Sequence, residues 1–145
     1  MSDGAVSMLE HGQKVLASQP FSVLLGAEVQ ALSPGRCELI LPLRHDLKQQ
    51  HGFAHGGVLS YLADNALTFA GGTAMGVPVV TGEFKINYIR PAVGERLLAR
   101  AVAEHSGKSQ AVCRCEVYVL HQGQEKLCAM AQGTIAALPD RPAES

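Results

Sequence analysis

The sequence predicts an α+β fold in which a curved, antiparallel, six-stranded sheet wraps around one long central helix. Two observations lead to this prediction. From Gly57 to Ala70 apolar side chains recur at helical spacing, while the segments before and after the helix alternate apolar and polar side chains with the period of two that is typical of strands. The elements follow the order short helix, two strands, long helix, four strands. Because a helix this apolar has to be buried, and a six-stranded sheet can curl around it, one domain accounts for the pattern.

The N-terminal part is expected to contain a short helix and a β-hairpin. Residues 2–19 have apolar side chains at roughly helical spacing and are followed by Pro20, which predicts a short amphipathic helix that ends there. Residues 24–33 and 36–43 alternate like strands and are separated by a Ser-Pro-Gly turn. In the first of these strands the inward-facing residues are predicted to be Ala27, Val29 and Ala31.

The central helix is expected to run from Gly57 to the Gly-Val-Pro sequence at residues 76–78. Its apolar face is predicted to consist of Leu59, Leu62, Ala63, Ala66, Phe69 and Ala70. Its opposite face is predicted to carry Gly57, Tyr61, Asp64 and Thr68. Asp64 is the only formal charge between Gln49 and Gly82, and a carboxylate in apolar surroundings is costly unless it is paired. Asp64 is therefore the first candidate for chemistry, with a capped or paired core carboxylate as the alternative.

Four more strands are expected after the helix. Their ranges are residues 79–90, 96–104, 110–121 and 126–138. The edges of such a sheet need partners, so at least a dimer is expected. The domain organisation predicted in this way is an N-terminal helical segment at 1–20, one domain at 21–138 and a tail at 139–145.

The start of the central helix is a candidate binding site for a developing negative charge. His55, Gly56 and Gly57 precede the first periodic residue, and the first N–H groups of a helix have no partner within the helix. Glycines let a ligand oxygen approach these donors closely, so a carbonyl oxygen could be stabilised there as it becomes an oxyanion. Asp64 follows about 10 Å further along the helix axis.

Composition excludes several other classes of protein. The chain has 145 residues, a net charge of −1 and a pI near 6.6, so neither nucleic acid nor an acidic membrane surface is an expected partner. No secretory signal and no membrane span are recognisable, and the four cysteines read as small buried hydrophobes of a reducing compartment, which favours the cytoplasm. No metal site is expected, because His51 and His55 lack the HExxH context and an evident third ligand.

The order of elements, and the pattern Gln49-x5-His55-Gly56-Gly57-x6-Asp64-x3-Thr68, resemble the hotdog-fold acyl-CoA thioesterases. The similarity is greatest to the phenylacetate-degradation (PaaI-like) type, which includes one branch of 4-hydroxybenzoyl-CoA thioesterases. It covers roughly residues 20–138, including the Asn-Tyr-Ile-Arg-Pro sequence at 87–91.

The resemblance implies a role for each matched residue. Asp64 would be the nucleophile or the general base, and the N–H of Gly56 would polarise the thioester carbonyl. Gln49 would help to hold the thioester or a water molecule. Thr68 matches a threonine of the aromatic-acyl branch, and Thr81 falls near a serine that assists water in some members. The expected catalytic residues are Asp64, Gly56, Gln49, His55 and Thr68, and the expected substrate-binding residues are Gly57, Tyr61, Thr81 and Arg90.

The implied reaction is hydrolysis of an acyl-CoA thioester, with phenylacetyl and hydroxybenzoyl among the expected acyl groups. No cofactor is implied, since coenzyme A is part of the substrate. The implied assembly is a homodimer or a homotetramer built as a dimer of dimers, with Asp64 from one chain and Gln49 and Gly56 from another. Two alternatives remain, a hydratase or dehydratase of the same fold and a non-catalytic acyl-CoA-binding module. Purely structural roles also remain open. His55 could be a residue that shapes the helix entry, Thr68 could donate its hydroxyl to the backbone of the preceding turn, and Tyr61 could be a packing residue.

Overall fold

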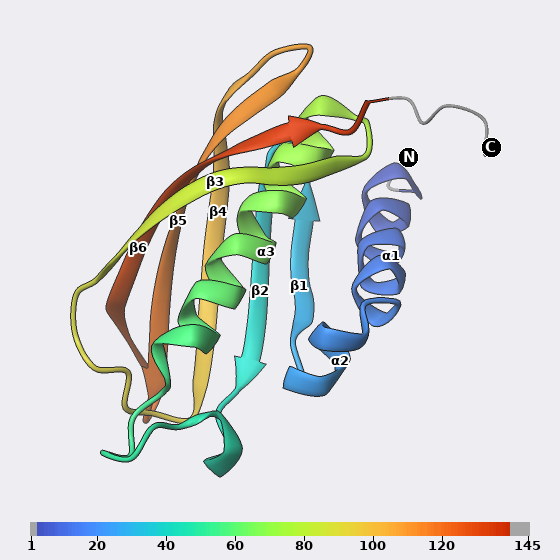
Figure 1. The fold of residues 1–145 in the computed structure, drawn as a ribbon. Coiled ribbons are helices and arrows are strands. Elements are labelled where there is room, and N and C mark those ends of the chain that lie inside the picture. The colour runs from blue at the N-terminus through green and yellow to red at the C-terminus, as the bar shows by residue number, and fades with distance from the viewer. Residues whose placement is uncertain (1–2, 140–145) are drawn as a thin grey trace, which may run out of the picture.

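The computed structural model describes residues 3–139. Its elements are shown in Figure 1. They are α1 (Asp3–Ala17), α2 (Pro20–Leu25), β1 (Glu28–Ser33), β2 (Arg36–Pro42), a 3₁₀ turn (His45–Leu47), α3 (Gly56–Met75), β3 (Val79–Tyr88), β4 (Arg96–Ser106), β5 (Gln110–His121) and β6 (Gln124–Ala137). The predicted tail lies outside the described residues except for Pro139.

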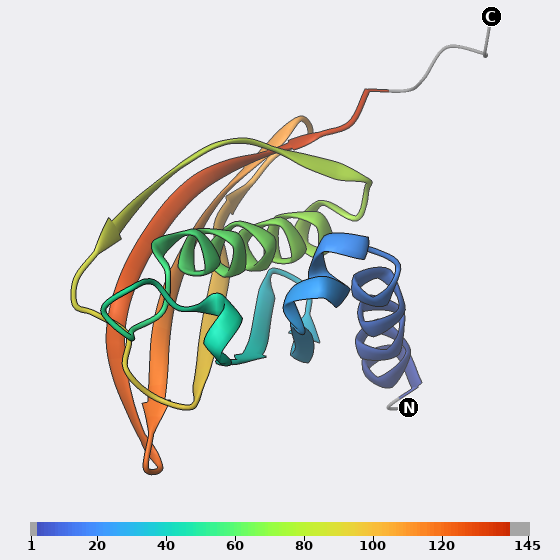
Figure 2. The ribbon, with the colours of Figure 1, turned by 60° about the horizontal axis from the view of Figure 1, so that its bottom comes forward.

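The six strands form one antiparallel sheet in the order β1-β2-β4-β5-β6-β3. The sheet curves around α3, as Figure 2 shows, and the predicted fold is thereby confirmed. At the β1 edge, α1 and α2 lie beside the strand. At the opposite edge, β3 has a neighbour on one side only.

The apolar face of α3 packs into the concave side of the sheet. Leu62, Ala63, Ala66 and Ala70 are completely buried, whereas Phe69 is only half-buried. Facing strands contribute side chains such as Leu39, Leu97, Val117 and Ile135, which are also completely buried. The core is therefore one cluster that joins the helix to the sheet.

The four cysteines belong to this core. All four are buried, and their thiols are free. Burial raises the pKa of each thiol, to about 11 for Cys113 and Cys128 and to about 12 for Cys115. Burial likewise raises the pKa of Cys37, so the prediction of small buried hydrophobes is confirmed.

The structure corrects the predicted boundary between the first helix and the first strand. Pro20 does not end the helical region but occupies the first turn of α2, where its missing N–H and fixed φ are tolerated. α2 closes at Gly26, whose φ of 88° is a left-handed conformation that glycine adopts without strain. Residues 24 and 25 are consequently helical, and the strand predicted from 24 begins at Glu28.

The predicted inward positions of β1 are partly wrong. The pairing register with β2 shifts between Val29, which faces Leu39, and Ala31, which faces Glu38. This β-bulge inserts one extra residue, so the alternation of side chains changes phase. Ala31 is therefore exposed, and Leu32 is buried in its place.

The central helix has well-defined ends. It begins at Gly56, one residue earlier than predicted, with His55 as the N-cap. It ends at Met75, and Gly76 is the C-cap, with φ 71° and an N–H that donates to the Gly72 carbonyl at 2.8 Å. None of the helices within residues 3–139 is both long enough and apolar enough to cross a bilayer.

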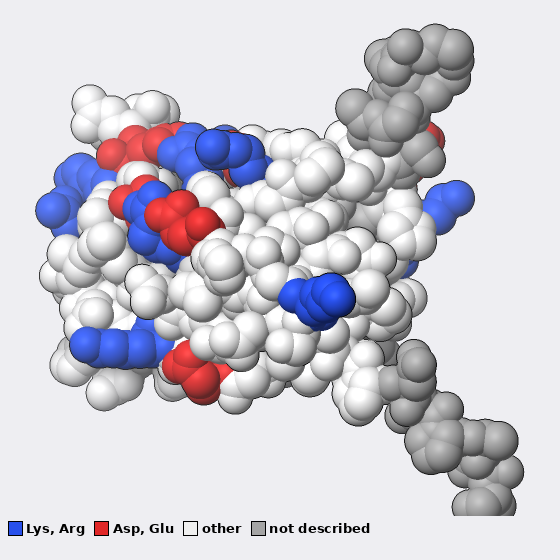
Figure 3. Space-filling view, turned by 90° about the horizontal axis from the view of Figure 1, so that it is seen from above, with Lys and Arg blue, Asp and Glu red and all other residues white. Residues whose placement is uncertain are grey.

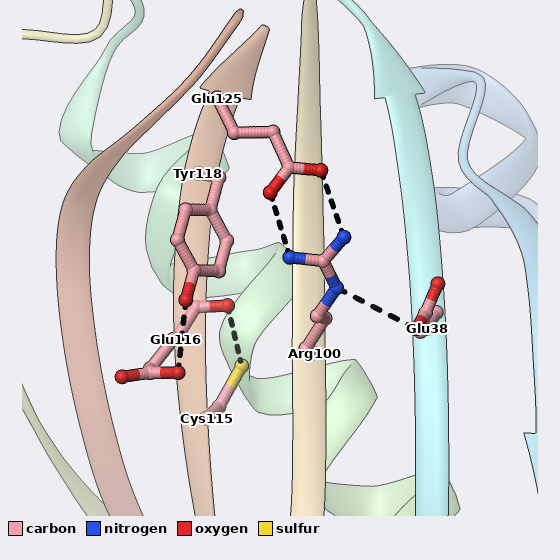
Figure 4. Close-up of polar contacts among 6 residues, drawn as sticks. All are labelled: Glu38, Arg100, Cys115, Glu116, Tyr118 and Glu125. Carbon is pink, nitrogen blue, oxygen red and sulfur yellow. Dashed lines mark hydrogen bonds and ion pairs between the residues drawn. The ribbon is translucent and has the colours of Figure 1, made fainter.

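The sheet face turned away from α3 carries an ionic network (Figure 4). The guanidinium of Arg100 donates two hydrogen bonds of 2.8 Å to the two carboxylate oxygens of Glu125. Arg100 also lies 3.5 Å from Glu38 and stacks 5.1 Å above the ring of Tyr118. The bond to Glu125 raises the pKa of Arg100, and the bond from Arg100 lowers the pKa of Glu125.

Candidate active site

The carboxylate of Asp64 lies against the first part of β3. Thr81 donates a hydrogen bond of 2.6 Å to Asp64 Oδ1, a short distance that is typical of a hydroxyl donating to a charged carboxylate. Asp64 Oδ2 has no partner among the described residues, yet no buried side-chain polar atom among them is unsatisfied. Asp64 therefore has one oxygen held in place and one oxygen open to solvent or a ligand.

Thr68 joins this arrangement one helical turn after Asp64. Its hydroxyl donates to the Asp64 carbonyl at 2.8 Å and lies 3.1 Å from the hydroxyl of Thr81. A threonine hydroxyl has one proton, and Thr81 donates its proton to Asp64, so a bond between the two hydroxyls would need the Thr68 proton in place of its bond to the Asp64 carbonyl. We refer to Asp64, Thr68 and Thr81 as the carboxylate cluster. From the sequence, Thr81 was matched only approximately to a serine of some family members. In the structure it is in direct contact with the Asp64 carboxylate.

The N–H groups at the start of α3 differ in their availability. Gly57 N–H donates to His55 Nδ1 at 2.8 Å, and Val58 N–H donates to the His55 carbonyl at 3.0 Å. Gly56 N–H has no partner within the part of the chain that the structure describes. Gly57, expected to contact substrate, thus has its donor occupied, while the donor of Gly56 is free. The ring of His55 accepts a backbone N–H at the helix entry, which is the structural role given above as the alternative to catalysis.

Gln49 lies in the tight loop that leads to this helix start. Its backbone bonds to Phe53 and Gly52 at 3.0 Å each, and its side-chain oxygen accepts the N–H of His51. The side-chain oxygen is therefore used within the loop, and the NH₂ group of the amide is left to donate to a ligand. Gln49, His55 and Gly56 form the helix-start group.

Tyr88, which received no role from the sequence, links β3 to the helix start. Its hydroxyl lies 3.1 Å from the Gly56 carbonyl, to which it donates, and 2.6 Å from the hydroxyl of Ser60. The ring also lies next to Gly56, since a Cβ placed there would be 3.4 Å from it. The alternation of side chains in β3 places Tyr88 on the same face as Phe84 and Ile86. This alternation was the one feature of the sequence that could have indicated that Tyr88 faces the helix.

Two other predicted residues point elsewhere. The hydroxyl of Tyr61 donates to Ser22 of α2 and accepts from Asn65 at 3.1 Å, so it helps to hold α2 against α3. Burial raises the pKa of Tyr61, which keeps this hydroxyl a donor. Arg90 is exposed and lies just beyond the end of β3. Its backbone N–H donates to the Cys128 carbonyl at 3.4 Å.

Within one chain, the carboxylate cluster and the helix-start group are separate. Asp64 follows Gly56 by eight residues, which corresponds to about 12 Å along the helix. β3 runs alongside, with Thr81 at the carboxylate cluster and Tyr88 at the helix start. Both groups thus border the same edge strand. Within residues 3–139, no three His, Cys, Asp or Glu side chains are grouped as a metal site would require.

A six-stranded antiparallel sheet wrapped around one long helix defines the class of hotdog-fold proteins, and comparisons with known proteins agree with this class. The family model described as "Thioesterase superfamily" matches residues 51–126, slightly over half of the chain. The chain belongs to the thioesterase superfamily, and it is a thioesterase of the PaaI-like type.

Three relatives illustrate the similarity. The crystal structure of a thioesterase family protein from Silicibacter pomeroyi is 35% identical with a TM-score of 0.85, covering 92% of this chain and 98% of that chain. A mutant of the phenylacetic acid degradation protein PaaI from Thermus thermophilus is 36% identical with a TM-score of 0.73, covering 83% and 100%. The acyl-coenzyme A thioesterase PaaI of Escherichia coli is 28% identical over 75% of this chain and 76% of its own length.

Proposed function

We propose that the protein hydrolyses acyl-CoA thioesters at a site formed by two subunits, with Asp64 as general base or nucleophile. The observation that carries the proposal is the state of Asp64, which has one carboxylate oxygen fixed by Thr81, one oxygen open, and no cationic partner among the described residues. A carboxylate that is oriented but not neutralised is suited to accept a proton or to attack a carbonyl carbon.

The helix-start group would supply the other half of the chemistry. The free N–H of Gly56, at the positive end of the α3 dipole, would bind the thioester oxygen as negative charge develops on it. Water activated by Asp64, or Asp64 itself, attacks the carbonyl carbon, and the C–S bond breaks to release the thiolate of coenzyme A. In the second route water then hydrolyses the mixed anhydride. In both routes the products are a free acid and a protonated thiol.

The edge strand explains how both groups can meet on one substrate. β3 is ten residues long and has no neighbouring strand on its outer side among the described residues, so alternate residues turn free N–H and C=O groups to that edge, and Val80 and Tyr88 are 49% and 54% exposed. If two copies pair antiparallel about the middle of β3, the Thr81 end of one strand lies beside the Tyr88 end of the partner subunit's strand. The carboxylate cluster of one chain then faces the helix-start group of the other. A dimer therefore holds two equivalent sites, and two dimers could assemble further.

Coenzyme A as the leaving group is supported by the family and by the name of the E. coli relative. Arg90 is the second residue after β3 and is exposed, which makes it the candidate contact for a coenzyme A phosphate. Thr68 and the Thermus relative, a phenylacetic acid degradation protein, support including aromatic acyl groups among the substrates to be tested.

The decisive experiment measures thiol release from acetyl-, hexanoyl-, decanoyl-, phenylacetyl- and hydroxybenzoyl-CoA by the wild type and by Asp64→Ala. Turnover that collapses in the variant, with an unchanged circular dichroism spectrum, supports the proposal. Equal turnover in both proteins, or no turnover of any thioester by the wild type, contradicts it. The four protein thiols add little background, because they are buried and have raised pKa values.

A mixing experiment tests the two-subunit site. Gly56→Pro removes only the proposed donor, because proline is favoured at the first position of a helix and His55 already has the extended conformation that a following proline needs. Gly56→Ala, which keeps the N–H, is the control. Refolding Asp64→Asn together with Gly56→Pro should restore about a quarter of wild-type activity, since half of the dimers are mixed and each has one intact site. No restoration would place the whole site within one chain.

A further inference from the structure

A cavity of about 850 Å³ opens between α1 and the second half of α3. Met8, His11 and Val15 of α1 form one wall, Thr68, Phe69 and Gly72 of α3 form the floor, and the chain from 77 to 79 forms the other wall. The size lies within the range of sites that enclose small ligands. Phe69 is half-buried rather than buried, and part of its side chain faces this space.

The cavity is free of formal charge. Its lining contains no Asp, Glu, Lys or Arg, and most of the lining surface belongs to apolar atoms. In the view from above, charged side chains gather at one end of the molecule and large areas of the remaining face are uncharged (Figure 3). Such a lining suits an uncharged, largely apolar group and disfavours phosphate or carboxylate groups, which would lose hydration without a lysine or arginine to pair with.

The wall formed by α1 is fixed in place. Leu16 is buried with an exposed fraction of 4%, and the Gln13 side chain donates to the Val29 carbonyl at 3.3 Å. At Gly12 the helix lies so close to β1 that a Cβ would collide with Leu32. The cavity is therefore built into the packing of α1 against β1 and does not depend on a loose segment.

The cavity is elongated along α3. Gln19 accepts a hydrogen bond from Asn65 at 3.2 Å, and Gly12 lies beside Phe69, so α1 runs antiparallel to α3. Val15 consequently lies at the level of Asn65 and Phe69, whereas Val77 lies beyond the end of α3. From Asn65 to Gly76 the lining extends over eleven residues, or about 16 Å.

Thr68 connects this cavity to the carboxylate cluster. It lines the cavity and lies 3.1 Å from the hydroxyl of Thr81, which in turn holds Asp64. A thioester with its carbonyl at Asp64 could therefore extend its acyl group into the cavity. α1 lies outside residues 51–126, so the matched family model does not account for this wall.

We propose that the space between α1 and α3 is the acyl-binding cavity, that it accepts uncharged acyl chains of medium length as well as shorter groups, that α1 forms one wall of it, and that its far end at Val77 sets the length limit. This proposal rests on the proposed thioesterase function.

The test uses three substitutions of one kind. Val15→Phe fills the cavity near the carboxylate cluster, and Val77→Phe fills its far end. Val23→Phe, on α2, is the matched control outside the cavity, in a separate groove behind α1. The three valines are 36%, 43% and 60% exposed, so each phenylalanine can be accommodated without disturbing the core. The quantity measured is kcat/KM for hexanoyl-, decanoyl- and phenylacetyl-CoA, each divided by the value for acetyl-CoA.

Val77→Phe should lower the decanoyl ratio roughly tenfold or more and leave the hexanoyl and phenylacetyl ratios unchanged, since excluding even one methylene from an apolar pocket costs about 10- to 200-fold. Val15→Phe should lower all three ratios, and Val23→Phe none of them. If the wild type is active and the ratios are unchanged in every variant, the proposed acyl-binding role of the cavity is wrong, while the proposed thioesterase function is unaffected. A changed oligomeric state in Val15→Phe or Val77→Phe, measured by light scattering, would also overturn it, because the groove would then be an interface between copies. A wild type without any thioester turnover would remove the function and the cavity together.

Discussion

Asp64 and Glu125 are carboxylates with opposite surroundings in the same fold. Glu125 lies on the outer face of the sheet, where both of its oxygens accept hydrogen bonds of 2.8 Å from Arg100. Asp64 lies on the helix side, where a single threonine hydroxyl holds one oxygen and the other is open. The outer carboxylate is paired with a cation, whereas the inner one has no cationic partner among the described residues and keeps free lone pairs.

This difference separates a structural acid from one that is available for chemistry. A bidentate arginine gives Glu125 a fixed geometry and lowers its pKa, which makes it a weaker base. A hydroxyl donor such as Thr81 orients a carboxylate without supplying a positive charge. The two sites can therefore be compared by making the same chemical change in each of them.

The largest expected difference comes from replacing each carboxylate with its amide. Asp64→Asn should lower kcat for thioester hydrolysis about 10²- to 10⁴-fold, because the amide can neither accept the proton nor attack the carbonyl. Glu125→Gln should leave kcat unchanged. Both variants should keep the wild-type circular dichroism spectrum. Equal losses of kcat in the two variants would mean that Asp64 acts through the fold and not through its charge.

The next prediction concerns the hydroxyl that holds Asp64. Thr81→Val should lower kcat about 10- to 100-fold, since a hydrogen bond to a charged group contributes about 1.5–3 kcal/mol. Thr81→Ser keeps the hydroxyl and should recover most of the activity, which a purely steric role of the threonine would not explain. Steady-state kinetics with a saturating acyl-CoA measures both variants. If valine and serine behave alike, the contact seen at 2.6 Å has no part in turnover.

The sequence was sufficient for the fold, and it singled out Asp64 as the candidate for chemistry. Asp64 stood out as a lone charge on an apolar helix, and the glycines at 57 and 76 marked helix ends that lie within one residue of those in the structure. These features are local, because capping and side-chain periodicity depend on neighbours within a few residues. The prediction failed where local signals compete, since Pro20 can both end one helix and begin another.

Features that depend on packing between distant segments could not be predicted. The contact of Tyr88 with Gly56 requires the curvature of β3 over α3, and the cavity requires the docking angle of α1. The β-bulge after Val29 shifts Ala31 to the surface although its residue type fits the core. Alternation indicates which residues share a face, but the identity of the element that covers this face is settled by tertiary packing.

A smaller effect is expected at Tyr88, which supports the helix start from β3. Tyr88→Phe should lower kcat about two- to tenfold and leave KM unchanged, because a neutral hydrogen bond contributes about 0.5–1.5 kcal/mol and here positions the Gly56 peptide. Tyr118→Phe, which removes a hydroxyl 3.0 Å from Glu116 on the outer face, is the matched control and should leave kcat unchanged. A similar loss in both variants would indicate a general effect on the sheet.

The smallest effect is expected for the outer ion pair, and it appears in stability as a function of pH. The pKa of Glu125 is lowered in the folded protein, so its contribution to stability is complete above the ordinary glutamate pKa of about 4.3 and is lost as the pH falls through the lower folded-state value. The side chains of Arg100 and Glu125 are 38% and 37% exposed, so solvent screening limits the contribution to about 1 kcal/mol or less. Urea unfolding should show that Glu125→Gln is slightly less stable than wild type at pH 7 in low salt. That difference should shrink in acid and in high salt, because protonation and screening each remove the charge interaction. A difference that stays constant with pH would mean that Glu125 stabilises the sheet through packing alone.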